Sequence, residues 1–303
     1  MSAASLSAQS ESAAPVVVGV DGSIASLSAV ELAAQEAQLR HRRLHIVHAF
    51  IWPYFNVRLE PSPAGPSEGG LRHAAEGILA EASERAQANA PCLVVTIELT
   101  TGAPAPVLLH HASTAALVVL GNRGLGGFSG LLVGSVAVQL AAFATCPILI
   151  SRGRKEPAGP IVLGVDGSPA NNRAVGYAFE LAALHGAPLT ALHAWEAPDM
   201  PLTPVDDPRG VQSNEIKVLT DTLAGWKAKY PSVNVESVVE HGNPRKALIS
   251  ASKGARVVVV GTRGRGGFAG LLLGSVSQAV LHHAACPVMM VPHQQSAGDP
   301  TTR

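Results

Sequence analysis

The stretch VVVGVDGS at Val16–Ser23 returns almost unchanged as IVLGVDGS at Ile161–Ser168. Each copy is an apolar, mostly β-branched run that ends in Asp-Gly, which is typical of a buried strand followed by a turn. Measured at the aspartates, the copies are 166 − 21 = 145 residues apart. A separation of this size indicates a duplicated domain, because solenoid proteins repeat units of 20–50 residues.

The rest of the first half is repeated as well. His48-Ala49-Phe50 returns as His193-Ala194-Trp195 at the same shift of 145. After a variable loop the shift becomes 242 − 102 = 140, and it then matches Gly102 with Gly242, Gly121 with Gly261, and Cys146 with Cys286. We therefore predict a flexible tail at 1–14, a first domain at 15–151, a linker at 152–159, a second domain at 160–293 and a C-terminal tail at 294–303.

Apolar runs alternate with helical patterns in each half. Val30, Ala33, Ala34 and Ala37 follow the i, i+3, i+4, i+7 spacing of one helix face, and Ser23 or Ser168 stands where an N-cap would help. The predicted strands after the first are 44–50, 93–99, 116–121 and 147–150, repeated at 189–195, 233–239, 256–261 and 287–291. Alternation of strands and helices predicts an α/β fold of two tandem domains, each an open parallel five-stranded sheet with helices on both faces.

Composition excludes some classes of function. The 303 residues have a formal net charge of zero, which disfavours a dedicated binder of nucleic acid or anionic membranes. Three widely spaced cysteines and a start without a signal-peptide pattern favour the cytoplasm. The apolar stretch 131–150 is long enough to span a membrane, but Pro147 predicts a buried helix, a turn and a strand instead.

A glycine-rich segment follows the fourth predicted strand of each half: GNRGLGGFSGLLVGSV at 121–136 and GTRGRGGFAGLLLGSV at 261–276. Ligands of open α/β sheets lie outside the carboxyl ends of the strands, where Asp21 and Asp166 also stand. Glycine permits a positive φ or a close backbone approach, and a helix N-terminus adds partial positive charge. The segments therefore predict two phosphate-binding loops.

Neither segment contains the Walker pattern GxxxxGK[ST] or the GxGxxG fingerprint. Both contain G-x2-G-x9-G-S, as Gly121, Gly124, Gly134 and Ser135, and again as Gly261, Gly264, Gly274 and Ser275. With the VGVDGS opening and the closing Cys-Pro strand, the chain resembles the ATP-binding universal stress proteins. The resemblance covers both halves and is close to tandem members of the actinobacterial kind.

The resemblance implies one ATP site per domain, with the question of an accompanying Mg²⁺ left open. The aspartate would lie against the sugar or its metal, the alanine of the second strand against the adenine, and the glycine segment around the phosphates. The residues so implied are Gly19, Asp21, Ala49, Gly121, Asn122, Arg123, Gly124, Leu125, Gly126, Gly127, Gly134, Ser135 and Val136 in the first half. In the second they are Gly164, Asp166, Ala194, Gly261, Thr262, Arg263, Gly264, Arg265, Gly266, Gly267, Gly274, Ser275, Val276 and Ser277.

Simpler roles compete with these. The glycines and aspartates could only make turns, Ser135 and Ser275 could cap the last helix, and the loop arginines could be solvated. We expect the two strand-end histidines, His48 and His193, to fill space rather than bind metal or transfer protons. The adjacent pairs His110-His111 and His282-His283 would point apart on a helix, which disfavours metal binding by either pair.

Three functions remain open from the sequence. The leading one is a nucleotide-dependent regulatory protein of stress adaptation, which binds ATP without efficient turnover. The alternative is a nucleotide hydrolase or nucleotidyl transferase, disfavoured because neither loop has the lysine. A nucleic-acid binder is suggested by RGRGGF, but the first copy reads RGLGGF. The resemblance also implies that the halves pair through their last strands about a pseudo-two-fold axis, with a homodimer of the chain left open.

Overall fold

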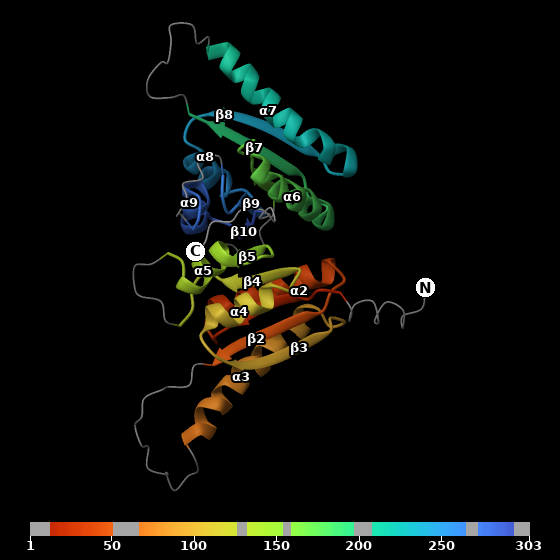
Figure 1. Ribbon diagram of the computed structural model, residues 1–303. Helices are drawn as coiled ribbons and strands as arrows, with labels where there is room; N and C mark the ends of the chain where they lie inside the picture. Colours follow the sequence, from red (N-terminus) through yellow and green to blue (C-terminus); the bar gives the residue numbers. More distant parts are fainter. Residues whose placement is uncertain are drawn as a thin grey trace. The chain divides into compact units, whose positions relative to one another are not determined.

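The computed structural model describes residues 13–50, 67–125, 132–153, 159–196, 208–264 and 272–293. The chain divides into two compact units, Met1–Ser151 and Arg152–Arg303 (Figure 1). Each unit is an α/β fold built on a parallel sheet, as the sequence predicts.

The first unit has five parallel strands in the order β3-β2-β1-β4-β5. The strands are β1 (Val16–Val20), β2 (Leu44–Phe50), β3 (Val95–Thr101), β4 (Leu117–Gly121) and β5 (Ile148–Ser151). The helices are α2 (Ile24–Leu39), α3 (Ser67–Asn89), α4 (Pro104–Ala112) and α5 (Ser135–Phe143). Helix α2 packs beside α3, and α4 packs beside α5. With right-handed crossovers, these two pairs cover opposite faces of the sheet.

The second unit repeats this order as β8-β7-β6-β9-β10. Its strands are β6 (Ile161–Gly164), β7 (Leu189–Trp195), β8 (Val235–His241), β9 (Val257–Gly261) and β10 (Val288–Val291). A 3-10 turn, η1 (Pro169–Asn171), precedes the helices α6 (Asn172–His185), α7 (Pro208–Lys229), α8 (Pro244–Ala251) and α9 (Ser275–His283). The duplicated sequence thus folds into duplicated topology.

The core of each unit lies between its central strands and the helices that cover them. Val16 and Val18 of β1 are fully buried, and so are Ala29 and Ala33 of α2. The small alanine side chains allow this helix to lie close to the sheet, and their counterparts in the second unit, Ala174 and Ala178, are buried alanines as well. The central strands are apolar throughout because both their faces are covered.

Two local details differ from the sequence predictions. The third strands begin two residues later than expected, at Val95 and Val235, because the sheet register starts at Leu44 and Leu189. Ser23 caps α2, accepting the Ser26 N–H at 3.1 Å, but the predicted side-chain cap by Ser168 is wrong. There the chain first makes the turn η1, which begins with a proline, and α6 begins four residues later at Asn172.

The apolar stretch 131–150 forms a helix and a strand. Helix α5 ends at Phe143 and β5 begins at Ile148, with Pro147 between them, as predicted. Among the helices of the described ranges, none combines the length and the apolar character needed to cross a membrane.

Candidate functional site

In the first unit, an aspartate and the glycine segment meet at the carboxyl edge of the sheet. Asp21 follows β1, the glycine segment follows β4, and these two strands are paired in parallel. Asp21 Oδ2 accepts the backbone N–H of Leu125 at 2.8 Å. Its Oδ1 accepts the hydroxyl of Ser23 at 2.6 Å and the Ser23 backbone N–H at 3.0 Å. The carboxylate is therefore fixed against the loop.

These hydrogen bonds keep Asp21 ionised. Burial alone would raise the pKa of its carboxyl group, but the Ser23 hydroxyl, the Ser23 and Leu125 backbone N–H groups and Ser26 outweigh that effect. The pKa of Asp21 is accordingly held below its usual value, because hydrogen bonds to a carboxylate favour the charged form. The site thus contains a fixed negative charge at neutral pH.

The second unit brings its aspartate to the same place. Asp166 Oδ1 accepts the backbone N–H of Ser168 at 2.7 Å. Its Oδ2 lies beside Gly264, only 2.7 Å from where a Cβ at that glycine would stand. The predicted juxtaposition of aspartate and glycine segment therefore occurs twice, although Arg265, the counterpart of Leu125, lies outside the described residues.

The glycines beside the aspartates are explained by close approach and not by a special backbone conformation. A Cβ on Gly124 would stand 2.2 Å from Asp21 Oδ2, inside the contact distance of any real pair of atoms. Neither Gly124 nor Gly264 has a positive φ. Of the two properties of glycine considered from the sequence, these positions use the close approach, whereas the turn glycines Gly22 and Gly167 have positive φ values of 83° and 72°.

Gly134 and Gly274 differ from these, because nothing in the described residues requires them to be glycine. Each is the N-cap of its helix, with φ values of −72° and −63° that any residue adopts. A Cβ would meet its nearest atom at 3.7 Å and 3.4 Å, which is ordinary contact. Their N–H groups donate to Asn122 O and Thr262 O, both at 2.8 Å, and so tie each helix start to the loop.

Ser135 and Ser275 are the first residues of α5 and α9, so the alternative that they cap these helices is wrong. Val136 and Val276 follow in the same first turn. Ser277 is buried and donates its hydroxyl to Gly261 O at 2.6 Å, which holds α9 to the end of β9. Its side chain thus faces the protein.

Three predicted glycines have packing roles. A Cβ on Gly19 would stand 2.7 Å from Leu108 of α4, and one on Gly164 would stand 3.1 Å from Leu248 of α8. At Gly121 it would meet the backbone of Ala25 at 2.7 Å. The predicted site residues Gly126, Gly127, Arg265, Gly266 and Gly267 lie outside the described residues.

The second strands reach the same edge through their histidines. His48 Nδ1 and His193 Nδ1 each lie 2.7 Å from the last carbonyl before the aspartate, Val20 O and Val165 O. Because a carbonyl only accepts, each Nδ1 donates, and the ring ties β2 to β1 or β7 to β6. His193 Nε2 also lies 2.6 Å from Glu215 Oε2. Ala49 and Ala194 follow these histidines in β2 and β7.

Ser23 is a residue whose role was missed from the sequence. It caps α2, as the sequence predicts, and its hydroxyl also donates to Asp21 and lies 3.4 Å from Arg123 O. The signal was the spacing Asp-x-Ser, in which a side-chain carboxylate commonly accepts from the residue two positions later.

Comparison with known proteins identifies the family. The pattern of the Universal stress protein family matches residues 14–152 and again residues 158–292. The chain belongs to the universal stress protein family. A universal stress protein of Mycobacterium tuberculosis is 36% identical over 283 residues, which cover 91% of this chain and 95% of the relative. One from Mycolicibacterium smegmatis is 37% identical over 290 residues, covering 91% and 96%.

The fold is that of solved universal stress proteins. A universal stress protein from Archaeoglobus fulgidus superposes with a TM-score of 0.69 at 18% identity, covering 92% of this chain and 98% of its own. A universal stress protein solved in complex with cAMP matches 46% of this chain and 95% of its own at 32% identity, with a TM-score of 0.36.

Proposed function

We propose that each universal stress domain binds one ATP, and that occupancy of the two sites regulates the protein's part in stress adaptation. The observation that carries this proposal is Gly134, with its counterpart Gly274. Backbone conformation and packing both leave room for a side chain at these helix starts, yet both are glycine. A phosphate lying directly on the helix N-terminus would require the absence of a Cβ.

The first turn of α5 supplies the donors for such a phosphate. The first intrahelical hydrogen bond runs from Val138 N–H to Gly134 O at 3.3 Å. The N–H groups of the three preceding residues, beginning with Ser135, therefore point out of the helix end. The helix dipole adds partial positive charge there, and the hydroxyl of Ser135 adds a further donor. These groups fit a polyphosphate.

The charge of Asp21 sets where the phosphates can lie. An ionised carboxylate repels a polyphosphate, so the phosphate chain would extend toward α5, and Asp21 would face the sugar hydroxyls or a bound cation. When bound, Mg²⁺ would neutralise phosphate oxygens, since it prefers hard oxygen ligands. Asp21 would then accept hydrogen bonds from the sugar hydroxyls or attract a bound cation, and Gly124 would make room for the Asp21 carboxylate.

The nucleotide carried by purified protein tests the proposal. Heating the purified protein should release ATP or ADP, identified by absorbance and mass, at up to two equivalents per chain. A turnover assay with added ATP then separates binding from hydrolysis, and we expect little product. Absence of binding by calorimetry after nucleotide removal would contradict the proposed function.

Gly134→Asp gives a test in which stability and binding move in opposite directions. Aspartate is a favoured N-cap and complements the dipole, so the helix start should gain roughly 0.3–1 kcal/mol. The same carboxylate would occupy the phosphate position and repel it, so the first site should lose at least about tenfold in affinity, roughly 1.4 kcal/mol. Gly274→Asp is the matched variant for the second site, and each should leave the other site intact. Unchanged binding by the double variant would mean that no phosphate lies on these helices.

A further inference from the structure

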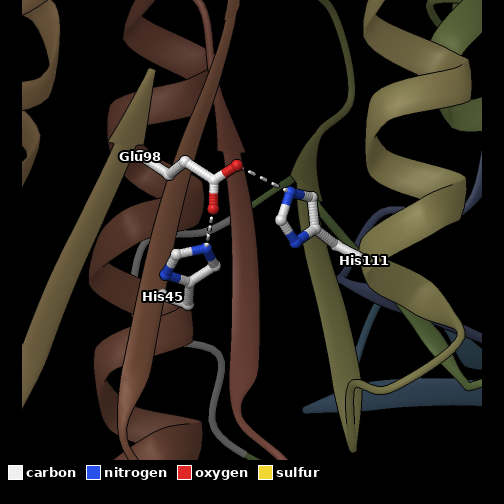
Figure 2. Close-up of side chains that lie close together, drawn as sticks. All are labelled: His45, Glu98 and His111. Atoms are coloured by element: carbon white, nitrogen blue, oxygen red, sulfur yellow. Dashed lines mark hydrogen bonds and ion pairs between the residues drawn. The ribbon is translucent and has the colours of Figure 1, made fainter. Parts of the chain in front are cut away.

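Two histidines and a glutamate converge on the face of the first domain that α4 covers (Figure 2). His45 Nε2 lies 3.1 Å from Glu98 Oε2, and His111 Nε2 lies 3.6 Å from Glu98 Oε1. One ligand atom from each of the three residues lies within 4.8 Å of the other two. We call these residues the His45–Glu98–His111 cluster.

The sheet register and one helix assemble the cluster. His45 near the start of β2 pairs with Thr96 of β3, and Glu98 stands two residues further along β3. Because side chains alternate along a strand, His45, Thr96 and Glu98 share one face of the sheet. His111 comes from the last turn of α4. His45 stands near the start of β2, whereas Asp21 and Gly124 lie beyond the carboxyl ends of the strands. The cluster is therefore separate from the candidate nucleotide site.

Neighbouring hydroxyl groups orient two of the three side chains. Thr100 donates its hydroxyl to Glu98 Oε1 at 2.5 Å, which fixes the carboxylate. His45 Nδ1 lies 2.8 Å from the hydroxyl of Thr96, which itself lies 3.4 Å from Leu44 O. Without a cation, Nε2 donates to the Glu98 carboxylate, which can only accept, and Nδ1 accepts from Thr96. When Thr96 instead donates to the Leu44 carbonyl, Nδ1 can donate to Thr96 and the lone pair of Nε2 is available to a cation. Ring nitrogens held in this way by an outer hydrogen bond are typical of metal-ligating histidines.

The second domain shows that the fold itself does not require these residues. At the shift of 145, His45 corresponds to Thr190, and at the shift of 140, Glu98 and His111 correspond to Val238 and Ala251. The second domain has the same strands and the same helix in these places. Its sequence therefore supplies replacements that a universal stress domain tolerates.

We propose that His45, Glu98 and His111 bind one divalent transition-metal cation of the Zn²⁺ class on the first domain. Two imidazole nitrogens and one carboxylate oxygen are a ligand set that zinc accepts and that magnesium does not prefer. A tetrahedral zinc with bonds of about 2.0–2.1 Å has ligand atoms roughly 3.3 Å apart. His45 Nε2 and His111 Nε2 lie 3.1 Å and 3.6 Å from different oxygens of Glu98. With one ligand atom from each residue the three atoms lie within 4.8 Å of one another, so side-chain rotations alone would draw them to the zinc spacing. Three protein ligands leave the fourth position to water or an outside ligand.

The site is within reach of solvent. The side chain of Glu98 is 42% exposed, while those of His45 and His111 are 16% and 15% exposed. A cation can therefore enter beside the exposed carboxylate and reach two imidazoles that are mostly buried. This proposal does not rest on nucleotide binding, because it uses a different part of the domain.

Titration of the full-length, metal-free protein with Zn²⁺ and with Co²⁺ tests the proposal. We expect one equivalent of Zn²⁺ to bind tightly, Co²⁺ to give the visible absorption of a tetrahedral site, and Mg²⁺ not to compete. The substitutions His45→Thr, Glu98→Val and His111→Ala, taken from the second domain, should each weaken Zn²⁺ binding at least about tenfold. The triple variant should lose the equivalent entirely and keep its thermal unfolding profile in chelator.

Two controls separate this site from incidental binding. Cys92→Ser removes the exposed thiol of the first domain, and His282→Ala breaks a histidine pair of the second. Neither should change the affinity or the Co²⁺ spectrum. If the triple variant binds Zn²⁺ as the unaltered protein does, or if a control removes the binding, or if no equivalent binds, the proposed site is wrong.

Discussion

Asp21 and Leu125 are 104 positions apart in the sequence, yet the carboxylate of the first accepts the backbone N–H of the second at 2.8 Å. The bond joins the end of β1 to the loop after β4 and places a negative charge in contact with an N–H group of the glycine segment. An anionic ligand approaching this loop would meet that charge. The ionisation state of Asp21 should therefore affect both the stability of the loop and the charge of the ligands that the loop can bind.

Asp21→Asn should destabilise the first domain without ligand. The amide removes the charge, and its NH₂ group would face either the Leu125 N–H or the donors of Ser23. The loss should be about 1 kcal/mol, because water screens this half-buried group. Denaturant unfolding of the nucleotide-free protein measures it.

The loss of unfolding free energy caused by Asp21→Asn should become smaller at low pH. The folded-state pKa of Asp21 is lowered, so its contribution is present above the unfolded value, about 3.9, and is lost as the pH falls through the folded value. The stability difference between the protein and Asp21→Asn should thus be constant near neutrality and shrink below about pH 4. A difference that grows as acid is added would contradict this account of the carboxylate.

Gly124 and Asp21 should be energetically coupled. In Gly124→Ala the new Cβ would stand 2.2 Å from Asp21 Oδ2, so the carboxylate must leave its hydrogen bonds. In an Asp21→Ala background the clash disappears, and the same change at Gly124 should cost little. A double-mutant cycle should give a coupling energy of roughly 1–2 kcal/mol. Additive effects of the two changes would show that the glycine is retained for another reason.

The two proposed nucleotide sites should have unequal affinities. The first glycine segment has Leu125, a residue that is 73% exposed, where the second has Arg265. A cation next to the phosphates adds a charge-assisted contact worth roughly 1.5–3 kcal/mol when well formed, about tenfold or more in affinity. Calorimetry should resolve two classes of site with different affinities. Arg265→Leu should make the two affinities equal, whereas Leu125→Arg should raise the affinity of the weaker site. Two identical sites in the unaltered protein would refute this prediction.

The sequence predicted the strands, their order of appearance and the meeting of Asp21 with its glycine segment, because these depend on repeats and on unbroken apolar runs. It predicted less where two segments must be placed side by side. In the sequence His111 stands beside His110, and nothing there places α4 over His45 and Glu98. Gly134 belongs to the predicted loop, but only the space around its Cα shows that neither packing nor backbone conformation requires a glycine there.

The pairing of the two domains through their last strands remains a prediction, and amide exchange can test it in the intact chain. In a parallel sheet, the N–H groups of successive residues alternate between the two neighbouring strands. Strand β5 pairs with β4 at Val118–Ile148, and β10 pairs with β9 at Val258–Val288. If each strand has only that neighbour, every second amide of Ile148–Ser151 and Val288–Val291 faces outward and should exchange quickly, since edge strands present unpaired N–H groups. If the apolar edges pair with each other, as the resemblance implies, all these amides should be protected together and lose protection together as denaturant is added. Residue-resolved exchange showing the alternating pattern would refute the pairing, and would leave the two domains joined through the linker alone.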